Sequence, residues 1–153
     1  MFTHSQEHVD PDLIRIEANI DDMNPEWIPY VMDKLFEKGA NDAVFIPVIM
    51  KKGRPGFMFQ ILASKDRLNE MEDVLFAETT TLGLRYSPVI CHRLSRKQTK
   101  VETRWGTIRV KTGSYRNRLV QVAPEYEDCA RIARNHGVPL KDVYHEARRE
   151  FDL

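Results

Sequence analysis

The first part of the chain switches between two hydrophobic periodicities, and their order constrains the fold more than any other feature of the sequence. Apolar and polar residues alternate from Leu13 to Ile20, which is the period of a half-buried strand. From Trp27 to Phe36 the apolar residues return every three to four positions, as they do on the buried face of a helix. Between these segments, Asn24 suits an N-cap and Pro25 suits the first helical position. The pattern predicts a strand followed directly by an amphipathic helix.

The strand-to-helix signal then recurs. Two β-rich segments, 43–50 and 57–63, flank a turn marked by glycine and proline at 51–56. Ser64 is a suitable cap for a second helix, and a fourth strand is expected over 82–94. The buried face of the second helix is expected to consist of Leu68, Met71, Val74 and Leu75. The order β-α-β-β-α-β predicts an α+β protein that contains a ferredoxin-like unit.

The rest of the chain predicts a smaller subdomain. Segments 98–103 and 107–111 flank Arg104-Trp105-Gly106 as a β-hairpin, and 118–122 is a candidate further strand. Pro124 and Pro139 then open two C-terminal helices. We therefore expect a disordered leader over 1–11, a ferredoxin-like unit over 12–94, and a hairpin plus two-helix subdomain over 95–153.

Charge and cysteine content exclude several classes of function. Lys plus Arg and Asp plus Glu number 23 each, so the chain has no overall attraction to nucleic acid or to anionic membranes. No apolar run approaches the ~20 residues of a membrane span. Two cysteines do not make a disulfide framework and favour a reducing compartment. We expect a cytoplasmic protein with neither nucleic acid nor membrane as partner, whose anion sites are local.

The predicted topology brings three polar connections to one edge of the sheet. In a βαββαβ unit, the first strand-to-helix connection, the central hairpin and the second helix-to-strand connection all lie at the same end. These connections contain Asp21-Asp22, the basic segment Lys51-Lys52-Gly53-Arg54, and Thr79-Thr80-Thr81. Acids, bases and hydroxyl groups are therefore expected to meet there.

Each of these clusters has a chemical use and also a structural explanation. Asp21 and Asp22 offer the hard oxygen ligands that Mg²⁺ or Mn²⁺ prefers. Lys51, Lys52 and Arg54 can neutralise phosphates, and Arg85 and the hydroxyls of Thr79, Thr80 and Thr81 can bond to phosphate oxygens. Together they predict a site for a nucleoside triphosphate with its metal. The structural alternatives are helix-start chemistry, a solvated hairpin and local backbone bonding by the threonines.

The predicted subdomain carries a second acidic cluster. Glu125, Glu127 and Asp128 fall in the first turn of a helix, where the helix dipole favours negative charge. Glu125 and Asp128 share a face and could instead orient a basic ligand group or a metal. Cys129 is expected to be a small buried residue, and Trp105 either stacks on a base or fills an interface.

Four segments in order resemble the LarC family of nickel insertion proteins. They are Asn19–Glu26, Met50–Gly56, Glu78–Arg85 and Pro124–Arg131. The resemblance implies insertion of nickel into pyridinium-3,5-bisthiocarboxylic acid mononucleotide, a CTP-dependent cyclometallation that yields the nickel-pincer nucleotide cofactor. It further implies that the C-terminal part of such a protein binds CTP with Mg²⁺ or Mn²⁺, while Ni²⁺ is the inserted metal.

By this resemblance, Asp21 or Asp22 is a metal ligand, and the basic hairpin and the threonines contact the triphosphate. The family's N-terminal part is absent here, so the chain is expected to act with that part of the same protein. It is also expected to form a homo-oligomer. Two alternatives stay open: a non-catalytic module that senses a ligand, and an oligomerisation module of a larger protein.

Overall fold

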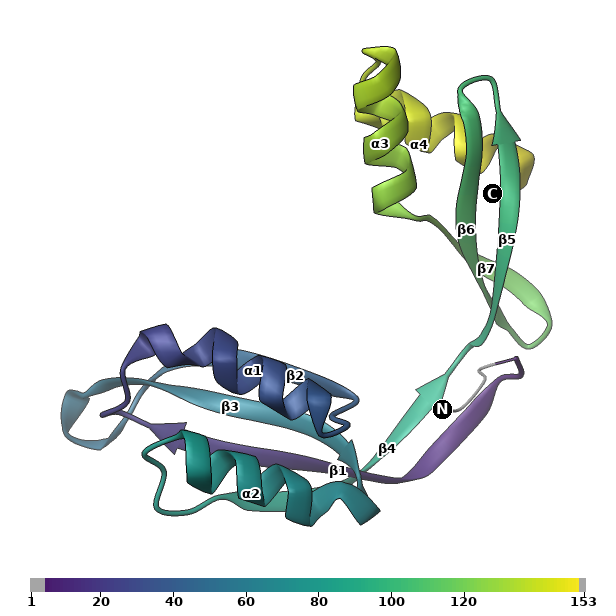
Figure 1. Cartoon of the computed structure of the whole chain (residues 1–153). Helices are drawn as coiled ribbons and strands as arrows, with labels where there is room; N and C mark the ends of the chain where they lie inside the picture. The colour runs from purple at the N-terminus through teal and green to yellow at the C-terminus, as the bar shows by residue number, and fades with distance from the viewer. Residues whose placement is uncertain (1–4, 152–153) are drawn as a thin grey trace. The chain divides into compact units, whose positions relative to one another are not determined.

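The computed structural model describes residues 5–151 and divides the chain into two compact units (Figure 1). The first, called here the N-terminal unit, is Asp10–Cys91. The second, the C-terminal unit, begins at His92 and also includes the described residues that precede Asp10.

The N-terminal unit has the predicted β-α-β-β-α-β order. Its elements are β1 (His8–Ile20), α1 (Ile28–Glu37), β2 (Asp42–Ile49), β3 (Pro55–Ser64), α2 (Leu68–Glu78) and β4 (Arg85–Arg93). The strands form one sheet in the order β2-β3-β1-β4, and β3 pairs antiparallel with both β1 and β2. The ferredoxin-like unit is therefore confirmed.

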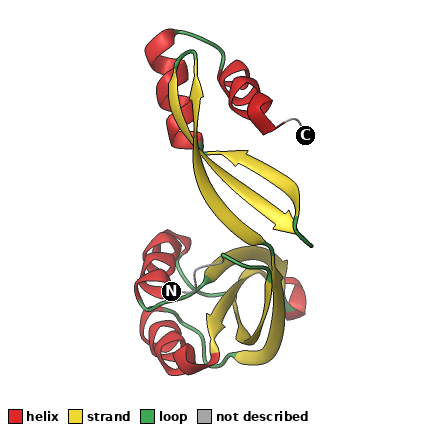
Figure 2. Cartoon of the chain, turned by 90° about the vertical axis from the view of Figure 1, so that its right-hand side faces the viewer, coloured by secondary structure: helices red, strands yellow, loops and turns green. Residues whose placement is uncertain are grey.

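Both helices pack on one face of this sheet (Figure 2). The core consists of alternate strand residues, such as Ile16 of β1 and Phe59 of β3, packed against Leu35 of α1 and Leu75 of α2, all with no exposed surface. Because side chains alternate along a strand, the intervening residues project to the opposite face, which α1 and α2 do not cover. We call this the open face. It carries Arg15, Glu17 and Asn19 of β1, Val44, Ile46 and Val48 of β2, and Met58, Gln60 and Leu62 of β3.

The helix start follows the predicted capping chemistry. The side chain of Asn24 accepts a hydrogen bond from the backbone N–H of Glu26 at 3.0 Å, and a 3₁₀ turn over Pro25–Trp27 leads into α1. Ser64 precedes a similar turn, Lys65–Arg67, but its side chain makes no capping bond. The start of the second helix was therefore predicted correctly, although the hydroxyl does not satisfy its N–H groups.

Two features of the N-terminal unit differ from the sequence expectation. Strand β1 begins at His8, so residues 8–11 are in the sheet rather than in a leader; residues 1–4 lie outside the described residues. Trp27 and Phe36, expected in the buried stripe, are 48% and 47% exposed. A two-layer fold buries only the narrow stripe that faces the sheet, here Val31 and Leu35, and the flanking aromatic rings stay at the surface.

The C-terminal unit contains a three-stranded sheet and two helices. Strands β5 (Ser95–Thr103), β6 (Gly106–Tyr115) and β7 (Arg118–Pro124) pair in sequence order as antiparallel neighbours. The predicted hairpin and the candidate strand at 118–122 are thus both present. Helices α3 (Tyr126–His136) and α4 (Leu140–Arg148) follow. Their buried residues, including Ile132 and Val143, pack with Ile108 and Val110 of β6 in a second core. Within residues 5–151 no helix is long and apolar enough to cross a membrane.

Candidate functional site

The structure brings two of the three predicted polar connections onto the acidic one. The Arg54 guanidinium donates from Nη1 to Asp21 Oδ2 at 3.2 Å, and the Thr80 hydroxyl donates to Asp22 Oδ1. Arg54 is 33 positions from Asp21 in the chain, and Thr80 is 58 positions from Asp22. Both pairs nevertheless meet at the end of β1. We call this the polar edge of the N-terminal unit.

The backbone of the hairpin explains how Arg54 reaches Asp21. Lys52 and Gly53 have positive φ angles of 64° and 69°, and the N–H of Met50 donates to the carbonyl of Arg54 at 2.7 Å. Successive left-handed residues reverse the chain with the twist that a hairpin requires. A Cβ on Gly56 would lie 2.5 Å from the Ile20 carbonyl oxygen, so a residue without a side chain lets the hairpin approach β1.

The cations of this edge are held loosely. The Arg54 and Asp21 side chains are 60% and 21% exposed, and such surface pairs contribute only about 0–1 kcal/mol to stability. Lys51 and Lys52 are exposed, and neither forms an ion pair with any described residue. Arg54 can therefore exchange Asp21 for another anion at small cost, and the two lysines are free to contribute to binding that anion.

The other predicted phosphate contacts are engaged elsewhere. The Thr79 hydroxyl donates to the Leu75 carbonyl at the end of α2, and the Thr81 hydroxyl donates to the Gly83 carbonyl at 2.7 Å. For these two residues the structure has the local backbone bonding that was the structural alternative. Only Thr80 reaches across to the acidic connection.

Arg85 bonds to Glu17 rather than to either aspartate, and it belongs to a network on the open face. Its Nε donates to Glu17 Oε2 at 2.8 Å, while Glu17 Oε1 accepts from Gln60 at 3.1 Å. The hydrogen bond from Gln60, followed by the positive charges of Arg85 and Arg15, holds the pKa of Glu17 below its usual range. The sequence pattern does not predict this network, because its four members come from three strands.

A hollow of about 460 Å³ lies next to the basic hairpin. It is lined by Asn19, Val48, Ile49, Met50, Lys51 and Met58. Sequence reasoning missed this feature, although Asn19 stands out as an uncharged polar residue on a strand that otherwise alternates apolar and charged residues. The hollow belongs entirely to the N-terminal unit.

The polar edge fits a metal ion only if a ligand brings most of its coordination. Within residues 5–151, no three or more His, Cys, Asp or Glu side chains gather as a metal cluster. Asp21 and Asp22 each use one oxygen in the bonds described above, which leaves Asp21 Oδ1 and Asp22 Oδ2. Mg²⁺ and Mn²⁺ commonly bind through one or two carboxylates plus the phosphates of a nucleotide, so this donor set fits a metal carried by a triphosphate.

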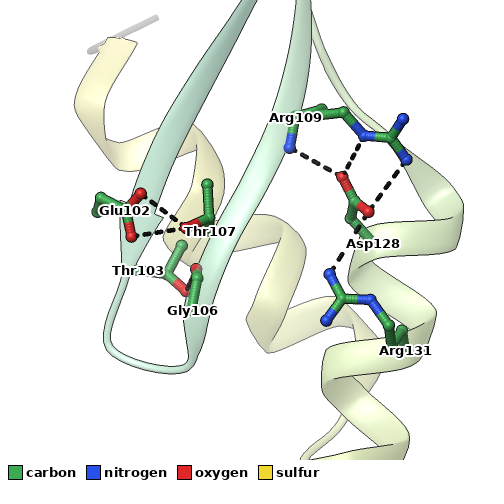
Figure 3. Close-up of polar contacts among 7 residues, drawn as sticks. All are labelled: Glu102, Thr103, Gly106, Thr107, Arg109, Asp128 and Arg131. Atoms are coloured by element: carbon green, nitrogen blue, oxygen red, sulfur yellow. Dashed lines mark hydrogen bonds and ion pairs between the residues drawn. The ribbon is translucent and has the colours of Figure 1, made fainter.

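The acidic cluster of the C-terminal unit serves its own fold (Figure 3). Asp128 accepts hydrogen bonds from the backbone N–H and Nε of Arg109 at 3.0 and 2.8 Å, and from Arg109 Nη2 at 3.1 Å. Arg131 adds a longer contact at 3.5 Å. The side-chain and backbone donors of Arg109 hold the pKa of Asp128 far below its usual range. Glu125 similarly pairs with Lys111 at 2.6 Å.

Two residues whose role the sequence left open, Asp128 and Trp105, make contacts within the C-terminal unit. Asp128 joins α3 to β6, and its oxygens are occupied by the chain's own arginines. Trp105 packs against the core of the C-terminal unit, with the Arg104 guanidinium 4.2 Å from its ring centroid. Trp105 therefore packs on its own unit, a role that neither of the two expectations named. Cys129 is fully buried as expected, and burial raises the pKa of its thiol.

Comparison with known sequences places the chain in a family. Residues 1–144 match the family model described as nickel insertion protein. The chain is 42% identical over 139 residues to the pyridinium-3,5-bisthiocarboxylic acid mononucleotide nickel insertion protein of Acetivibrio thermocellus, covering 91% of this chain and 34% of that protein. It is also 42% identical over 138 residues to the protein of the same description from Thermotoga petrophila, covering 90% of this chain and 35% of that protein. The chain thus spans about a third of the length of these relatives.

Solved structures agree with this assignment. LarC2, described as the C-terminal domain of a cyclometallase involved in the synthesis of the NPN cofactor of lactate racemase, superposes with a TM-score of 0.86 at 32% identity. The match covers 97% of this chain and 100% of LarC2. A protein of Methanopyrus kandleri, 21% identical with a TM-score of 0.69 over 90% of this chain and 85% of that one, shares the fold. By its sequence and its structure, this chain belongs to the nickel insertion protein family.

Proposed function

We propose that the polar edge of the N-terminal unit binds the triphosphate of CTP together with Mg²⁺ or Mn²⁺. The proposal combines membership of the nickel insertion family with the arrangement of Asp21, Arg54 and Thr80 around one point. The observation that carries it is the contact between Asp21 and Arg54, an exposed pair with two further lysines on the adjoining hairpin.

An incoming metal-triphosphate complex can replace this contact without leaving either charge unpaired. The Arg54 guanidinium then donates to the phosphate oxygens instead of to Asp21. The Asp21 carboxylate thereby becomes available as a ligand for the cation. Because the pair is solvent-exposed, breaking it costs little, while charge-assisted bonds from Arg54, Lys51 and Lys52 to phosphate oxygens are short and strong. The Thr80 hydroxyl keeps the neighbouring Asp22 in place.

The divalent cation, when bound, neutralises negative charge on the triphosphate and orients it. The protein's share is to fix the two carboxylates at the end of β1 and to hold the hairpin over them. Arg85 is placed on the open face by Glu17 and is not required as a phosphate ligand in this arrangement.

The complete reaction belongs to a longer protein than this chain. We propose that the chain acts as the C-terminal, nucleotide-binding third of a CTP-dependent cyclometallase that inserts Ni²⁺ into pyridinium-3,5-bisthiocarboxylic acid mononucleotide. Nickel and the mononucleotide are substrates, and the N-terminal part of the protein is the partner that completes the site. This chain alone is expected to bind CTP without inserting nickel.

Calorimetric titration of the purified chain with CTP, ATP and GTP, with and without Mn²⁺, tests the proposal. We expect metal-dependent binding with a preference for CTP. Lys52→Ala should weaken binding about tenfold with or without metal, since it removes one charge-assisted contact. Asp21→Asn should weaken it mainly when metal is present. Lys38→Ala, an equal change of charge at the opposite end of the unit, is the matched control. Absence of binding to any nucleotide would refute the proposal.

An assembly role is the second candidate, and edge strand β4 favours it. Tyr86 and Ile90 of this strand are 55% and 73% exposed, and an edge strand with apolar side chains can pair with another chain. Analytical ultracentrifugation, which measures the oligomeric state, distinguishes the candidates when it is combined with the nucleotide titration. A stable oligomer that binds no nucleotide supports the assembly role, whereas nucleotide binding by the chain in any oligomeric state supports the first proposal.

A further inference from the structure

Positive charge is concentrated in one of the two units. Residues 92–153 contain 14 Lys and Arg against 8 Asp and Glu, whereas residues 10–91 contain 9 against 14. The even balance of the whole chain therefore combines a basic C-terminal unit with an acidic N-terminal unit. Because an anion responds to the charge near it, the C-terminal unit attracts anions although the chain as a whole does not.

Many of these cations lie on one face of the C-terminal sheet. Val101, Ile108 and Val110 pack toward α3 and α4, so the residues that alternate with them project to the opposite face. We call this the cationic face. It carries Arg96, Gln98, Lys100 and Glu102 of β5, Thr107, Arg109 and Lys111 of β6, and Gln121 and Ala123 of β7, all of them exposed. Four of these residues are cations and one is an acid.

The strand register leaves two of the cations without a counter-charge. Lys100 is directly opposite Arg109, and like charges in that position destabilise a sheet. Arg96 is opposite Gly113, which has no side chain to balance it. The carboxylate of Glu102 accepts a hydroxyl of β6 at 2.7 and 2.9 Å (Figure 3), and within residues 5–151 neither Lys100 nor Arg96 forms an ion pair. This arrangement costs stability in the protein alone and suits an anion from outside the chain.

The other two cations of this face add to the excess charge. Lys111 contacts Glu125, but both side chains reach solvent, and exposed ion pairs contribute little to stability. Lys111 can therefore turn from Glu125 to a ligand at small cost. Arg109 shares the Asp128 carboxylate with Arg131, so two guanidinium groups surround one acid. The neighbourhood of Lys100 thus stays positive even where ion pairs form.

The spacing of the unpaired cations selects a ligand that is negatively charged at both ends. Arg96 and Lys100 are four positions apart on one strand, which corresponds to about 13 Å in an extended chain. Gln98 lies between them on the same face, opposite Lys111, and its amide offers one acceptor and two donors. A single phosphate reaches only one end of this row. A mononucleotide whose ring carries two ionised thiocarboxylates has a phosphate at one end and acid groups at the other, joined by ribose and ring.

We propose that the cationic face binds pyridinium-3,5-bisthiocarboxylic acid mononucleotide, the substrate that receives nickel. The inference rests on the proposed function, because that function supplies a ligand with this distribution of charge. One end of the ligand pairs with Arg96 and the other with Lys100 and Lys111, while Gln98 bonds between them. The triphosphate of CTP has its own proposed site in the other unit, so the two nucleotides do not compete for one set of cations.

Three ligands separate charge at two ends from charge at one. Pyridinium-3,5-dicarboxylic acid mononucleotide replaces sulfur by oxygen and stays charged at both ends. Nicotinamide mononucleotide keeps the phosphate, ribose and ring but carries an uncharged amide, and inorganic phosphate lacks ribose and ring. In calorimetric titrations of the purified chain, we expect the dicarboxylate to bind about fivefold more tightly than nicotinamide mononucleotide, and phosphate to bind most weakly. Equal affinities for all three would indicate a diffuse layer of counterions and overturn the inference.

Two substitutions on β5 locate the site. Arg96→Gln and Lys100→Gln each remove one charge, and each should lower the affinity for the dicarboxylate about fivefold. The two effects should add in the double variant, because the positions are well separated. Lys141→Gln, an equal change of charge on α4, which packs on the covered side of the sheet, is the matched control and should bind as wild type. Wild-type affinity in both β5 variants would overturn the inference.

Thermal unfolding provides a readout that a purely structural role would not give. Lys100→Gln removes the repulsion from Arg109, so it should raise the unfolding temperature of the free protein while it weakens binding. A loss of affinity together with a gain in stability cannot come from misfolding. A lower unfolding temperature than wild type would contradict the unbalanced charge on which the inference rests.

Titration of the same proteins with CTP and Mn²⁺ keeps this inference separate from the proposed function. We expect the β5 variants to bind CTP as wild type does. Binding of CTP but not of the dicarboxylate by wild type would overturn the inference alone, and binding of neither would also refute the proposed function. Binding of the dicarboxylate without CTP would support the inference and refute the triphosphate site. If Lys100→Gln instead dissociated an oligomer in ultracentrifugation and bound the dicarboxylate as wild type does, the face would contact the acidic unit of another copy, and the inference would fail.

Discussion

Replacing Asp128 by Asn is expected to destabilise the C-terminal unit far more than its size suggests. The Asp128 side chain is only 12% exposed, and it accepts three hydrogen bonds from Arg109, which joins α3 to β6. Asparagine has the same shape but carries no charge and presents an NH₂ group where an acceptor is needed. The substitution therefore removes the charge-assisted bonds and turns a donor toward a guanidinium.

The expected loss follows from the burial of the two partners. Hydrogen bonds to charged groups are worth about 1.5–3 kcal/mol each when their partner stays buried. The Arg109 side chain is 49% exposed, so water replaces part of what it loses. We expect the free energy of unfolding of the C-terminal unit to fall by about 2 kcal/mol, which corresponds to roughly 8–15 °C in the unfolding midpoint of a unit this small.

Trp105 provides the assay, because it packs against the core of the same unit. In a Trp27→Phe background it is the only tryptophan, and urea unfolding followed by its fluorescence reports on that unit. Glu127→Gln is the control, since it removes the same charge from the neighbouring, exposed position. Equal stability of Asp128→Asn and Glu127→Gln would refute the claim that the carboxylate joins helix to sheet.

The contact between Asp128 and Arg109 also predicts that stability depends on pH. The pKa of Asp128 is lowered in the folded state, so its stabilisation is fully present above the unfolded-state pKa of about 3.9. It is lost progressively as the pH falls below that value. Wild type should therefore lose stability between about pH 4 and pH 2 more steeply than Asp128→Asn. Parallel pH profiles of the two proteins would contradict this reasoning.

Three further outcomes are expected. Gly56→Ala should lower the unfolding free energy by about 1–3 kcal/mol, because its Cβ would come 2.5 Å from a main-chain oxygen of β1, and a thermal melt measures this. Partly exposed Cys91 should react with a thiol reagent in the native protein, whereas Cys129, buried and with a raised pKa, should react only on unfolding. Glu7→Gln should speed amide exchange at Arg116, whose N–H donates to the Glu7 carboxylate at 2.8 Å; an unchanged rate would show that this bond does not persist in solution.

The sheet order and the helix positions could be predicted because several local signals agreed. Alternation in β1, the Asn24-Pro25 start of the first helix and the Gly-Pro turn before β3 all favour the same topology. Extents were harder to predict. The alternation in β1 does not mark its beginning, because His8 and the residues after it join the sheet through backbone bonds that need no apolar pattern.

The candidate site was predicted at the level of connections rather than contacts. Topology alone placed the connections that contain Asp21, Arg54 and Thr80 at one edge. In the structure Arg54 bonds to Asp21, and Thr80 bonds to the neighbouring Asp22. Topology could not show that the Thr79 and Thr81 hydroxyls bond to nearby backbone carbonyls, because the sequence does not distinguish among three adjacent threonines. Nor could it pair Asp128 with Arg109, because the choice among surface arginines depends on the register of β6 against α3.

The proposed site can be located directly by the paramagnetic effect of Mn²⁺ on amide NMR signals. With CTP present, the signals of Asp21, Asp22 and Thr80 should broaden first, while those of Gly39 and Ser64 at the other end of the unit stay sharp. Mn²⁺ without CTP should have little effect, because two adjacent carboxylates alone make a poor metal site. Broadening centred elsewhere, or the same broadening with Mn²⁺ alone, would contradict a metal-triphosphate site at the polar edge.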